Sequence, residues 1–310
     1  MDKSGRVFCL MGPTAVGKTD LAIELLNDFP FEIISVDSAM VFRDMNIGAA
    51  KPTTTELELA PHHLIDLIDP TESYSVASFF KDVTKLIDDI HSAGKLPLLV
   101  GGTMMYFRAL QQGLSQLPTA DEAIRSQLLE QAAQHGWQAM HYRLQQVDPI
   151  AARSIKANDS QRIQRAMEVY QITGKPISHF WQQQKKQRSY RFINLALFPN
   201  NRAFLHARIA KRFKMMLKMG FIEEVERLRA DYALEASMPS MRCVGYRQVW
   251  QYLEGELSQQ EMLDKGIAAT RQLAKRQLTW LRSWPDVHYF EPWQIFLKRQ
   301  ILDSIIDSCY

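Results

Sequence analysis

A short stretch near the N-terminus has the residue types and the spacing needed to hold phosphate. The stretch GPTAVGKT at 12–19 meets the pattern G-x-x-x-x-G-K-[ST], in which Gly12 and Gly17 are followed by Lys18 and Thr19. Glycines let the backbone bend so that successive N–H groups converge on anionic oxygens, a lysine adds a cation, and a threonine hydroxyl can ligate Mg²⁺. We therefore predict a phosphate site, but the loop alone does not distinguish a kinase, a motor or a GTPase from a group-transfer enzyme.

A carboxylate follows the second apolar segment of the chain. Asp37 comes directly after FEIISV at 31–36 and precedes small residues. Two interpretations stay open from the residues alone. In the first, Asp37 caps a helix or lies in the outer coordination shell of Mg²⁺, where it contacts ligands of the ion and not the ion itself. In the second, Asp37 points into the phosphate site as a general base.

Other basic residues and histidines are weaker candidates. Arg208 and Arg212 lie four residues apart in FLHARIAKRFKMM and share a helical face. One of them could reach phosphate, although a structural ion pair is an equally good interpretation. His62 and His63 stand in PHHLIDLIDP, where neighbouring side chains point in different directions and no third ligand follows. We expect this segment to be a loop rather than a metal site.

The elements around these residues predict an α/β fold. Short apolar runs at 6–11, 31–36 and 96–100 alternate with segments of helical spacing, among them 75–95. Buried strands that alternate with helices indicate a parallel sheet with crossover connections, here of the P-loop NTPase type. Ligands bind beyond the carboxyl ends of such strands. The loop at 12–19, Asp37 and Thr103 are therefore expected to face one crevice.

The pattern becomes helical from about residue 114. Thr119 and Glu122 have the spacing of a capping box at the start of one predicted helix. A second predicted helix is bounded by Asn158 and Gly174.

An apolar, strand-like run returns at 192–198, after a polar and basic connection. The simplest account is a P-loop core domain of 1–113 and 192–310, with C-terminal helices, that is interrupted by a helical insertion of 114–191.

Two segments collect positive charge although the whole chain carries only +3. Within 151–191, nine basic residues face two acidic ones, a difference of +7: Arg153, Lys156, Arg162, Arg165, Lys175, Lys185, Lys186, Arg188 and Arg191. The stretch 268–284 has basic residues and no acid: Arg271, Lys275, Arg276 and Arg282. Each cluster is either a solvated helix face or the footprint of a polyanion such as RNA.

The composition excludes several classes of protein. Hydrophobic residues make up 46% and charged residues 23%, as in ordinary soluble globular proteins. No apolar run reaches the roughly eighteen residues of a membrane span, and the N-terminus lacks a signal-peptide cleavage site. Cys9, Cys243 and Cys309 have no CxxC spacing, so neither a disulfide framework nor a zinc site is indicated. We expect a cytoplasmic monomer that does not contact membranes, with Cys9 in a strand core.

Seven motifs together resemble the tRNA dimethylallyltransferase (tRNA isopentenyltransferase) family. They run in the family's order from residue 12 to about 284, and the last 25 or so residues carry none. The motifs are GPTAVGKT, ISVDSAMVFRDMNIGAAKP, HHLIDLIDP, LLVGGTMMYF, NDSQRIQRAMEV, MRCVGYRQVW and ATRQLAKRQLTWLRSW.

The resemblance implies a specific reaction. In this family the loop holds the diphosphate of dimethylallyl diphosphate rather than ATP. The five-carbon group passes to the exocyclic N6 of the adenosine on the 3′ side of the anticodon in tRNA, and diphosphate leaves with Mg²⁺. An exocyclic adenine nitrogen is a poor nucleophile and needs a base. The adenosine must also leave its stack, which is easier in a single-stranded loop.

The resemblance also assigns roles to residues. Asp37 is implied to be the base, Arg212 to neutralise charge, and Thr14 to place the reacting groups. The diphosphate is implied to bind Gly12, Pro13, Thr14, Ala15, Val16, Gly17, Lys18 and Thr19, with Mg²⁺ on Thr19. Contacts with tRNA are implied for Asp37, Ser38, Ala39, Met40, Thr103, Gln161, Arg162, Ile163, Gln164, Arg165, Arg242, Cys243, Val244, Gly245, Tyr246, Arg247, Lys275, Arg276, Gln277, Leu278, Thr279, Trp280, Leu281 and Arg282.

Two other functions would use part of the same residues. A P-loop kinase that phosphorylates a small molecule with ATP would account for 12–19 and Asp37, but not for the basic helices. An RNA-binding nucleotide switch would account for the loop and the basic helices, but it would not need Asp37 as a base.

Overall fold

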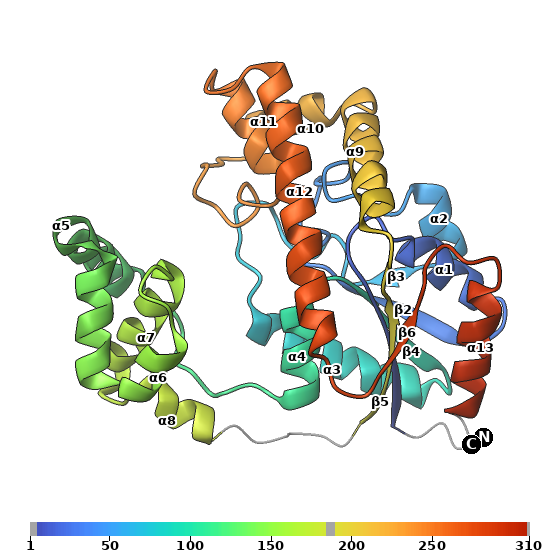
Figure 1. Cartoon of the computed structure of the whole chain (residues 1–310), viewed down its shortest axis with the longest axis horizontal. Coiled ribbons are helices and arrows are strands. Elements are labelled where there is room, and N and C mark those ends of the chain that lie inside the picture. Colours follow the sequence, from blue (N-terminus) through green and yellow to red (C-terminus); the bar gives the residue numbers. More distant parts are fainter. Residues whose placement is uncertain (1–4, 184–189, 309–310) are drawn as a thin grey trace. The chain divides into compact units, whose positions relative to one another are not determined.

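The computed structural model describes residues 5–183 and 190–308. The chain divides into two compact units, one made of 1–111 with 189–310 and the other of 112–188. Figure 1 labels the helices and strands of both units. We describe each unit by itself.

One parallel sheet organises the first unit. Its six strands among the described residues have the order β3-β2-β4-β1-β5-β6. Their bounds are β1 Arg6–Met11, β2 Phe31–Val36, β3 His62–His63, β4 Leu96–Gly101, β5 Arg191–Leu197 and β6 Val287–Phe290. The predicted α/β fold with a parallel sheet is confirmed. Strand β1, which leads into the loop at 12–19, lies inside the sheet between β4 and β5.

Helices cover both faces of this sheet, and strand β1 shows why. Its side chains alternate, so that Phe8 and Leu10 join one core while Val7, Cys9 and Met11 join the other. All five are fully buried. The first core includes residues of α1 (Lys18–Leu25) and α13 (Leu297–Asp307), and the second includes residues of α3 (Val76–Ser92) and α4 (Met104–Gln112). The expected core position of Cys9 is confirmed.

A helical layer completes the first unit. It consists of α9 (Arg202–Lys218), α10 (Phe221–Asp231), α11 (Tyr246–Leu253) and α12 (Gln259–Arg282). A capping box of Ser258 and Glu261 starts α12. Helix α12 packs in the core of the helical layer through Met262, Ile267, Ala274 and Leu278, whereas Leu281 belongs to the core that includes residues of α3 and α4. Helix α12 therefore joins the helical layer to the sheet (Figure 1).

The second unit contains only helices among its described residues. They are α5 (Glu122–Val147), α6 (Pro149–Ser154), α7 (Ser160–Thr173) and α8 (Ile177–Gln182), and they share one apolar core. Gly136 breaks α5 with a φ of 78°. The predicted capping box was wrong, because the side chain of Asp121, not of Thr119, accepts the hydrogen bond from Ile124 N–H.

The bounds of α7 also differ slightly from the prediction. Its N-cap is Asp159 rather than Asn158, and Gly174 ends it with a φ of 67°, as predicted.

Candidate active site

The strand register brings the predicted site residues to one edge of the sheet. Gly101 of β4 pairs with Met11 of β1 on one side and with Val36 of β2 on the other. The segments that follow these three residues are the loop at 12–19, Asp37, and Gly102 with Thr103. Ser38 N–H donates to the Thr103 hydroxyl over 3.2 Å, and Thr103 N–H donates to the Val36 carbonyl over 3.2 Å. The segments that were predicted to face one crevice therefore lie next to one another at one edge of the sheet.

The loop at 12–19 has the backbone expected of an anion cradle. Ala15 and Gly17 have positive φ values of 65° and 98°, and α1 starts at Lys18. The Lys18 ammonium donates to the carbonyls of Gly12 (3.0 Å) and Pro13 (2.8 Å). Burial lowers the pKa of Lys18 to about 8; Asp37 opposes this shift, and Arg212 adds to it. The hydrogen-bond acceptors of Lys18 are thus neutral carbonyls, and no carboxylate forms an ion pair with it among the described residues.

Asp37 caps a turn rather than a helix. Its Oδ1 accepts the N–H groups of Ala39 (2.8 Å) and Met40 (3.4 Å). Its Oδ2 has no hydrogen bond among the described residues. The charge of Asp37 counteracts the lowering of the pKa of Lys18 and of Arg212 by burial, so Asp37 lies within electrostatic range of both. One carboxylate oxygen is therefore held in place while the other stays available.

The two arginines of α9 have different surroundings. Arg208 donates from Nε to the carbonyl of Ala15 (3.0 Å), and its guanidinium lies 5.8 Å from the centre of the Trp293 ring. Burial lowers the pKa of Arg212, while Asp37 and Asp20 counteract that effect. Arg208 therefore supports the backbone of the loop, and Arg212 is the arginine held near the acids of the site.

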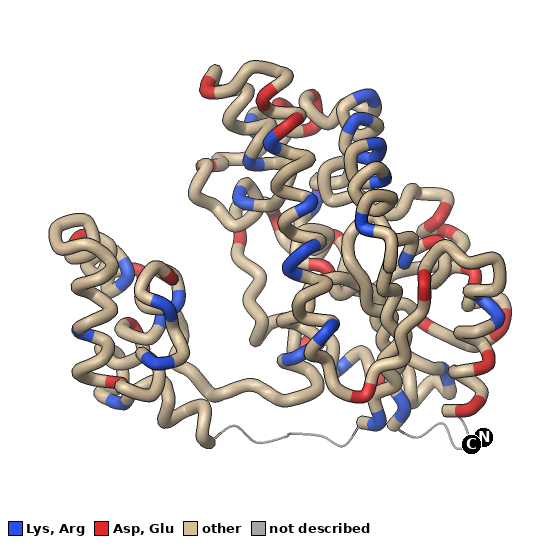
Figure 2. The backbone as a smooth tube through the Cα atoms, viewed as in Figure 1, with Lys and Arg blue, Asp and Glu red and all other residues tan. Residues whose placement is uncertain are grey.

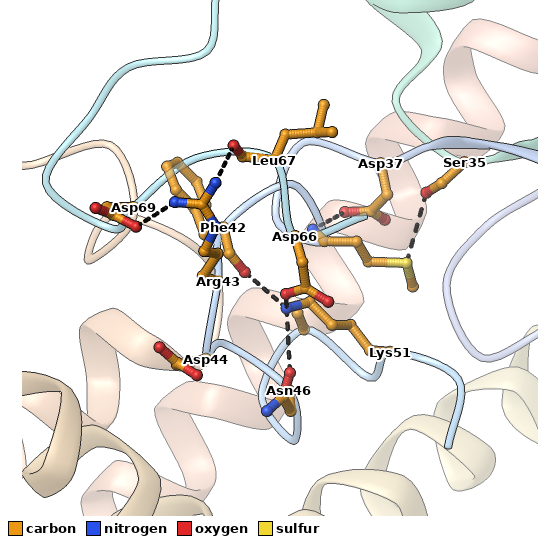
Figure 3. Close-up of polar contacts among 12 residues, drawn as sticks. Ser35, Asp37, Phe42, Arg43, Asp44, Asn46, Lys51, Asp66, Leu67 and Asp69 are labelled. Atoms are coloured by element: carbon orange, nitrogen blue, oxygen red, sulfur yellow. Dashed lines mark hydrogen bonds and ion pairs between the residues drawn. The ribbon is translucent and has the colours of Figure 1, made fainter. Parts of the chain in front are cut away.

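Lys51 holds the segment that follows Asp37. Its side chain is only 3% exposed. Figure 3 shows its ammonium donating to the carbonyl of Phe42 (2.6 Å), to Asn46 Oδ1 (3.1 Å) and to the carboxylate of Asp66. A buried lysine with three acceptors is satisfied, so Lys51 serves the shape of this segment.

A buried carboxylate holds the same segment from the helical layer. Glu224, 2% exposed, accepts N–H groups of residues 46–48 over 2.7–3.1 Å. The Tyr246 hydroxyl donates to Glu224 (2.7 Å) and accepts from Ala49 N–H (3.1 Å). The backbone beyond Asp37 is therefore fixed from two sides.

The histidine segment has structural contacts. His62 and His63, expected in a loop, instead form the edge strand β3. The contacts join His63 to Glu32, Asp66 to Lys51 and Asp69 to Arg43. Among the described residues, no group of three or more His, Cys, Asp or Glu could hold a metal ion.

The basic residues of α12 lie on its exposed side. Arg271, Lys275, Arg276 and Arg282 are exposed and form no ion pair within the described chain. Figure 2 shows positive residues along both α9 and α12. We did not predict the charge of α9 as a surface feature; this helix has six basic residues and no acidic one: Arg202, Arg208, Lys211, Arg212, Lys214 and Lys218. The absence of acids over 202–218 was the signal that could have indicated it.

The arginines of α7 pair with acids. Arg165 donates to Glu168 (2.6 Å) and to the carbonyl of Pro118 (2.6 Å). Arg162, which is more exposed, contacts Asp159 at 3.4 Å. Lys185, Lys186 and Arg188 of the same predicted cluster lie outside the described residues, as does Cys309.

Five residues implied to contact tRNA have buried side chains. They are Ile163, Tyr246, Gln277, Leu278 and Leu281, none more than 8% exposed. Each of these motifs includes a helical segment whose inward face packs in the core, so these five side chains have core contacts, and their contact with tRNA stays a prediction. Gly245 is also buried, whereas the remaining positions implied to contact tRNA are partly or fully exposed.

No helix in the described part of the chain combines the length and the apolar character needed to cross a membrane.

Comparisons with known proteins agree on one family. A family model described as IPP transferase matches residues 40–284. A tRNA dimethylallyltransferase of Legionella pneumophila is 56% identical over 309 residues, which cover 97% of this chain and 99% of the relative. That alignment spans the loop at 12–19 and Asp37, which precede the region of the family model.

Solved structures share the fold over nearly the whole chain. The full-length tRNA isopentenylpyrophosphate transferase of Bacillus halodurans has a TM-score of 0.72 and 35% identity, with 98% of this chain and 96% of that chain covered. A eukaryotic dimethylallyltransferase, described in structures of the enzyme acting on tRNA, has a TM-score of 0.81 and 26% identity, with 98% and 80% covered.

Proposed function

The chain belongs to the IPP transferase family of tRNA dimethylallyltransferases, and we propose that it transfers the dimethylallyl group of dimethylallyl diphosphate to N6 of the adenosine on the 3′ side of the anticodon. The observation that carries the proposal is the strand register, which sets the loop at 12–19 beside Asp37 and Thr103. N-alkylation with a diphosphate leaving group needs an anion cradle and a base in one site.

The donor side of the site neutralises the leaving group. As the allylic C–O bond breaks, its electron pair and the developing negative charge pass to diphosphate. In this proposal that charge is bound by the amides of the loop, the start of α1 and the Lys18 ammonium, a role that the loop conformation supports. Arg212 adds a second cation near Asp37.

The acceptor side removes a proton. The N6 lone pair is delocalised into the adenine ring, so the amine must lose a proton as the C–N bond forms. Asp37 Oδ2 takes that proton, while Oδ1 stays bound to the N–H groups of Ala39 and Met40. A positioned base of this kind contributes about 10²–10⁴-fold in rate. The Thr103 hydroxyl, which accepts from Ser38 N–H, keeps its own proton for a contact with the target nucleotide. Thr14 of the loop is proposed to help place the two reactants.

The residues of the site suit a magnesium ion that is shared with the substrate. The Thr19 hydroxyl lies in the first turn of α1, next to the loop that we propose for the diphosphate, and would be the protein ligand. Mg²⁺ is usually held by one or two protein ligands together with substrate phosphates rather than by a protein cage. When bound there, Mg²⁺ would neutralise charge on the departing diphosphate.

The basic helices suit the other substrate. Base contacts in RNA require nucleotides that leave their stack, and the anticodon loop offers single-stranded ones. The exposed cations of α12, which have no acidic partner in the described chain, can contact the phosphates of such a loop. Because its proposed substrate is tRNA, we expect the enzyme to act in the cytoplasm.

A direct assay tests this function. The protein is incubated with dimethylallyl diphosphate, Mg²⁺ and unmodified tRNA, and the nucleosides of the digested tRNA are analysed by mass spectrometry. We expect N6-dimethylallyladenosine and an equal amount of diphosphate. Turnover of ATP without prenyl transfer in a parallel reaction would contradict the proposal and favour a kinase.

A further inference from the structure

The side chain of Gln277 bridges two loops of the site. Gln277 belongs to α12 and is 8% exposed. Its Oε1 accepts the N–H of Thr14 over 2.9 Å, and its Nε2 donates to the carbonyl of Gly102 over 3.0 Å. One amide therefore connects the loop at 12–19 to the end of β4, immediately before Thr103.

Gly102 leaves the space that this amide occupies. A Cβ at residue 102 would lie 2.2 Å from Gln277 Nε2 and 3.1 Å from the carbonyl oxygen of Gly12. The φ of Gly102 is not positive, so its backbone does not itself require glycine. Close approach of the Gln277 amide is the physical reason for a glycine here.

The surroundings of Gln277 separate it from the RNA-facing side of its helix. Lys275 and Arg276, its neighbours in the chain, are exposed, whereas Gln277 points inward with Leu278. The resemblance placed Gln277 among the tRNA contacts, but its two hydrogen bonds lead to the donor loop and to β4. Its position in the motif and its contacts in the fold thus suggest different roles.

We propose that Gln277 is a positioning residue for the diphosphate loop and not a tRNA contact. The inference rests on the proposed function, because it assigns diphosphate to the loop at 12–19. The Thr14 N–H is part-buried in the loop, and without the Gln277 acceptor it would have to find another partner, since a donor shielded from water is costly to leave unsatisfied. The loop would then turn, and the amides around it would lose their alignment toward the diphosphate oxygens.

Two glutamines of α12 allow a matched test. Gln277→Met removes the acceptor and keeps the length of the side chain. Gln272→Met makes the same change at an exposed position that has no hydrogen bond among the described residues. We expect Gln277→Met to weaken binding of inorganic diphosphate with Mg²⁺ about tenfold by titration calorimetry, and to change the affinity for unmodified tRNA less than twofold. Gln272→Met is expected to change neither affinity.

A second variant moves the amide without changing α12. Because the clash at residue 102 is with the end of a flexible side chain, Gly102→Ala is expected to displace the Gln277 amide and reproduce the loss of diphosphate binding. In the double variant the two losses of diphosphate affinity are expected not to add, since both changes remove the same hydrogen bond of the Gln277 amide. Thermal unfolding of each variant checks that the chain is folded.

Two results would overturn the inference. One is weaker tRNA binding with unchanged diphosphate binding in Gln277→Met, which would return Gln277 to the RNA side. The other is unchanged diphosphate binding in both Gln277→Met and Gly102→Ala. Failure of the wild-type protein to make N6-dimethylallyladenosine would instead contradict the proposed function, so the two failures are distinguishable.

Discussion

The arginines of α7 and the basic residues of α12 have different surroundings, although both helices carry clusters of positive charge. Arg165 and Arg162 of α7 contact Glu168 and Asp159. The cations of α12 between 271 and 282 have no acidic partner within the described chain. A basic helix can therefore hold its own fold together or leave its charges for a ligand, and the neighbouring acids decide which.

Glu168 explains the behaviour of α7. It is fully buried and accepts from Asp121 N–H (2.9 Å), Arg125 Nε (2.9 Å) and Arg165 Nη1 (2.6 Å). Burial by itself would raise the pKa of Glu168, but the bonds from Arg165 and Asp121 outweigh it and hold the pKa below its usual range. The carboxylate thus ties the start of α5 to α7, and two arginines are used to keep it charged.

The first prediction concerns that carboxylate. Glu168→Gln is expected to destabilise the helices of 112–188 by about 2–4 kcal/mol, because it removes the buried charge that Arg125 and Arg165 contact. The cost is limited because both arginines are partly exposed to water. Hydrogen exchange of α5 and α7 in the full chain measures the effect. Asp159→Asn is the control, since it removes the partner of Arg162 but keeps a good N-cap, and it is expected to cost less than about 0.5 kcal/mol. Equal effects of the two changes would contradict the distinction.

The second prediction compares the two helices in RNA binding. Lys275→Ala and Arg276→Ala are each expected to weaken tRNA affinity a few-fold and to reduce the slope of log affinity against log salt by about 0.7–0.9, as for one lost phosphate contact. Arg165→Ala is expected to lower stability and leave that slope unchanged. A slope that falls as much for Arg165→Ala as for Lys275→Ala would show that both clusters contact RNA.

The third prediction extends the comparison to Lys18, another cation without a carboxylate in hydrogen-bond contact. With a pKa of about 8, Lys18 is charged below that pH and loses its proton as the pH rises through it. The affinity for inorganic diphosphate is expected to fall up to about tenfold between pH 7 and 9. Lys18→Met is the reference, because the ratio of the two affinities removes the titration of diphosphate itself. A ratio that stays constant over this range would contradict the assigned pKa.

The central strands could be predicted because their burial leaves a local signal. The runs at 6–11 and 31–36 match β1 and β2, and 96–100 falls one residue short of β4. Strands β3 and β6 were not predicted, since each lies at a sheet edge and is only partly buried, so neither has a continuous apolar run.

The site could be predicted only in part. The loop at 12–19 and Asp37 are local features of a strand end, whereas the roles of Glu168 and Gln277 depend on partners that are 43 and 263 residues away in sequence, respectively. A motif cannot tell which of its positions faces inward when the partner lies on a distant element. This is why the motifs alone did not show that Gln277 and Tyr246 face inward or that Arg165 pairs with Glu168.

The measurement that tests the central claim most directly is single-turnover prenyl transfer by Asp37→Asn with saturating tRNA and dimethylallyl diphosphate. Asparagine can still accept the N–H groups of Ala39 and Met40, so the turn is kept while the base is lost. We predict that the rate of transfer falls about 10²–10⁴-fold while the affinities for tRNA and diphosphate change less than twofold. Transfer at close to the wild-type rate would contradict Asp37 as the base, and would leave the protein closer to an RNA-binding switch.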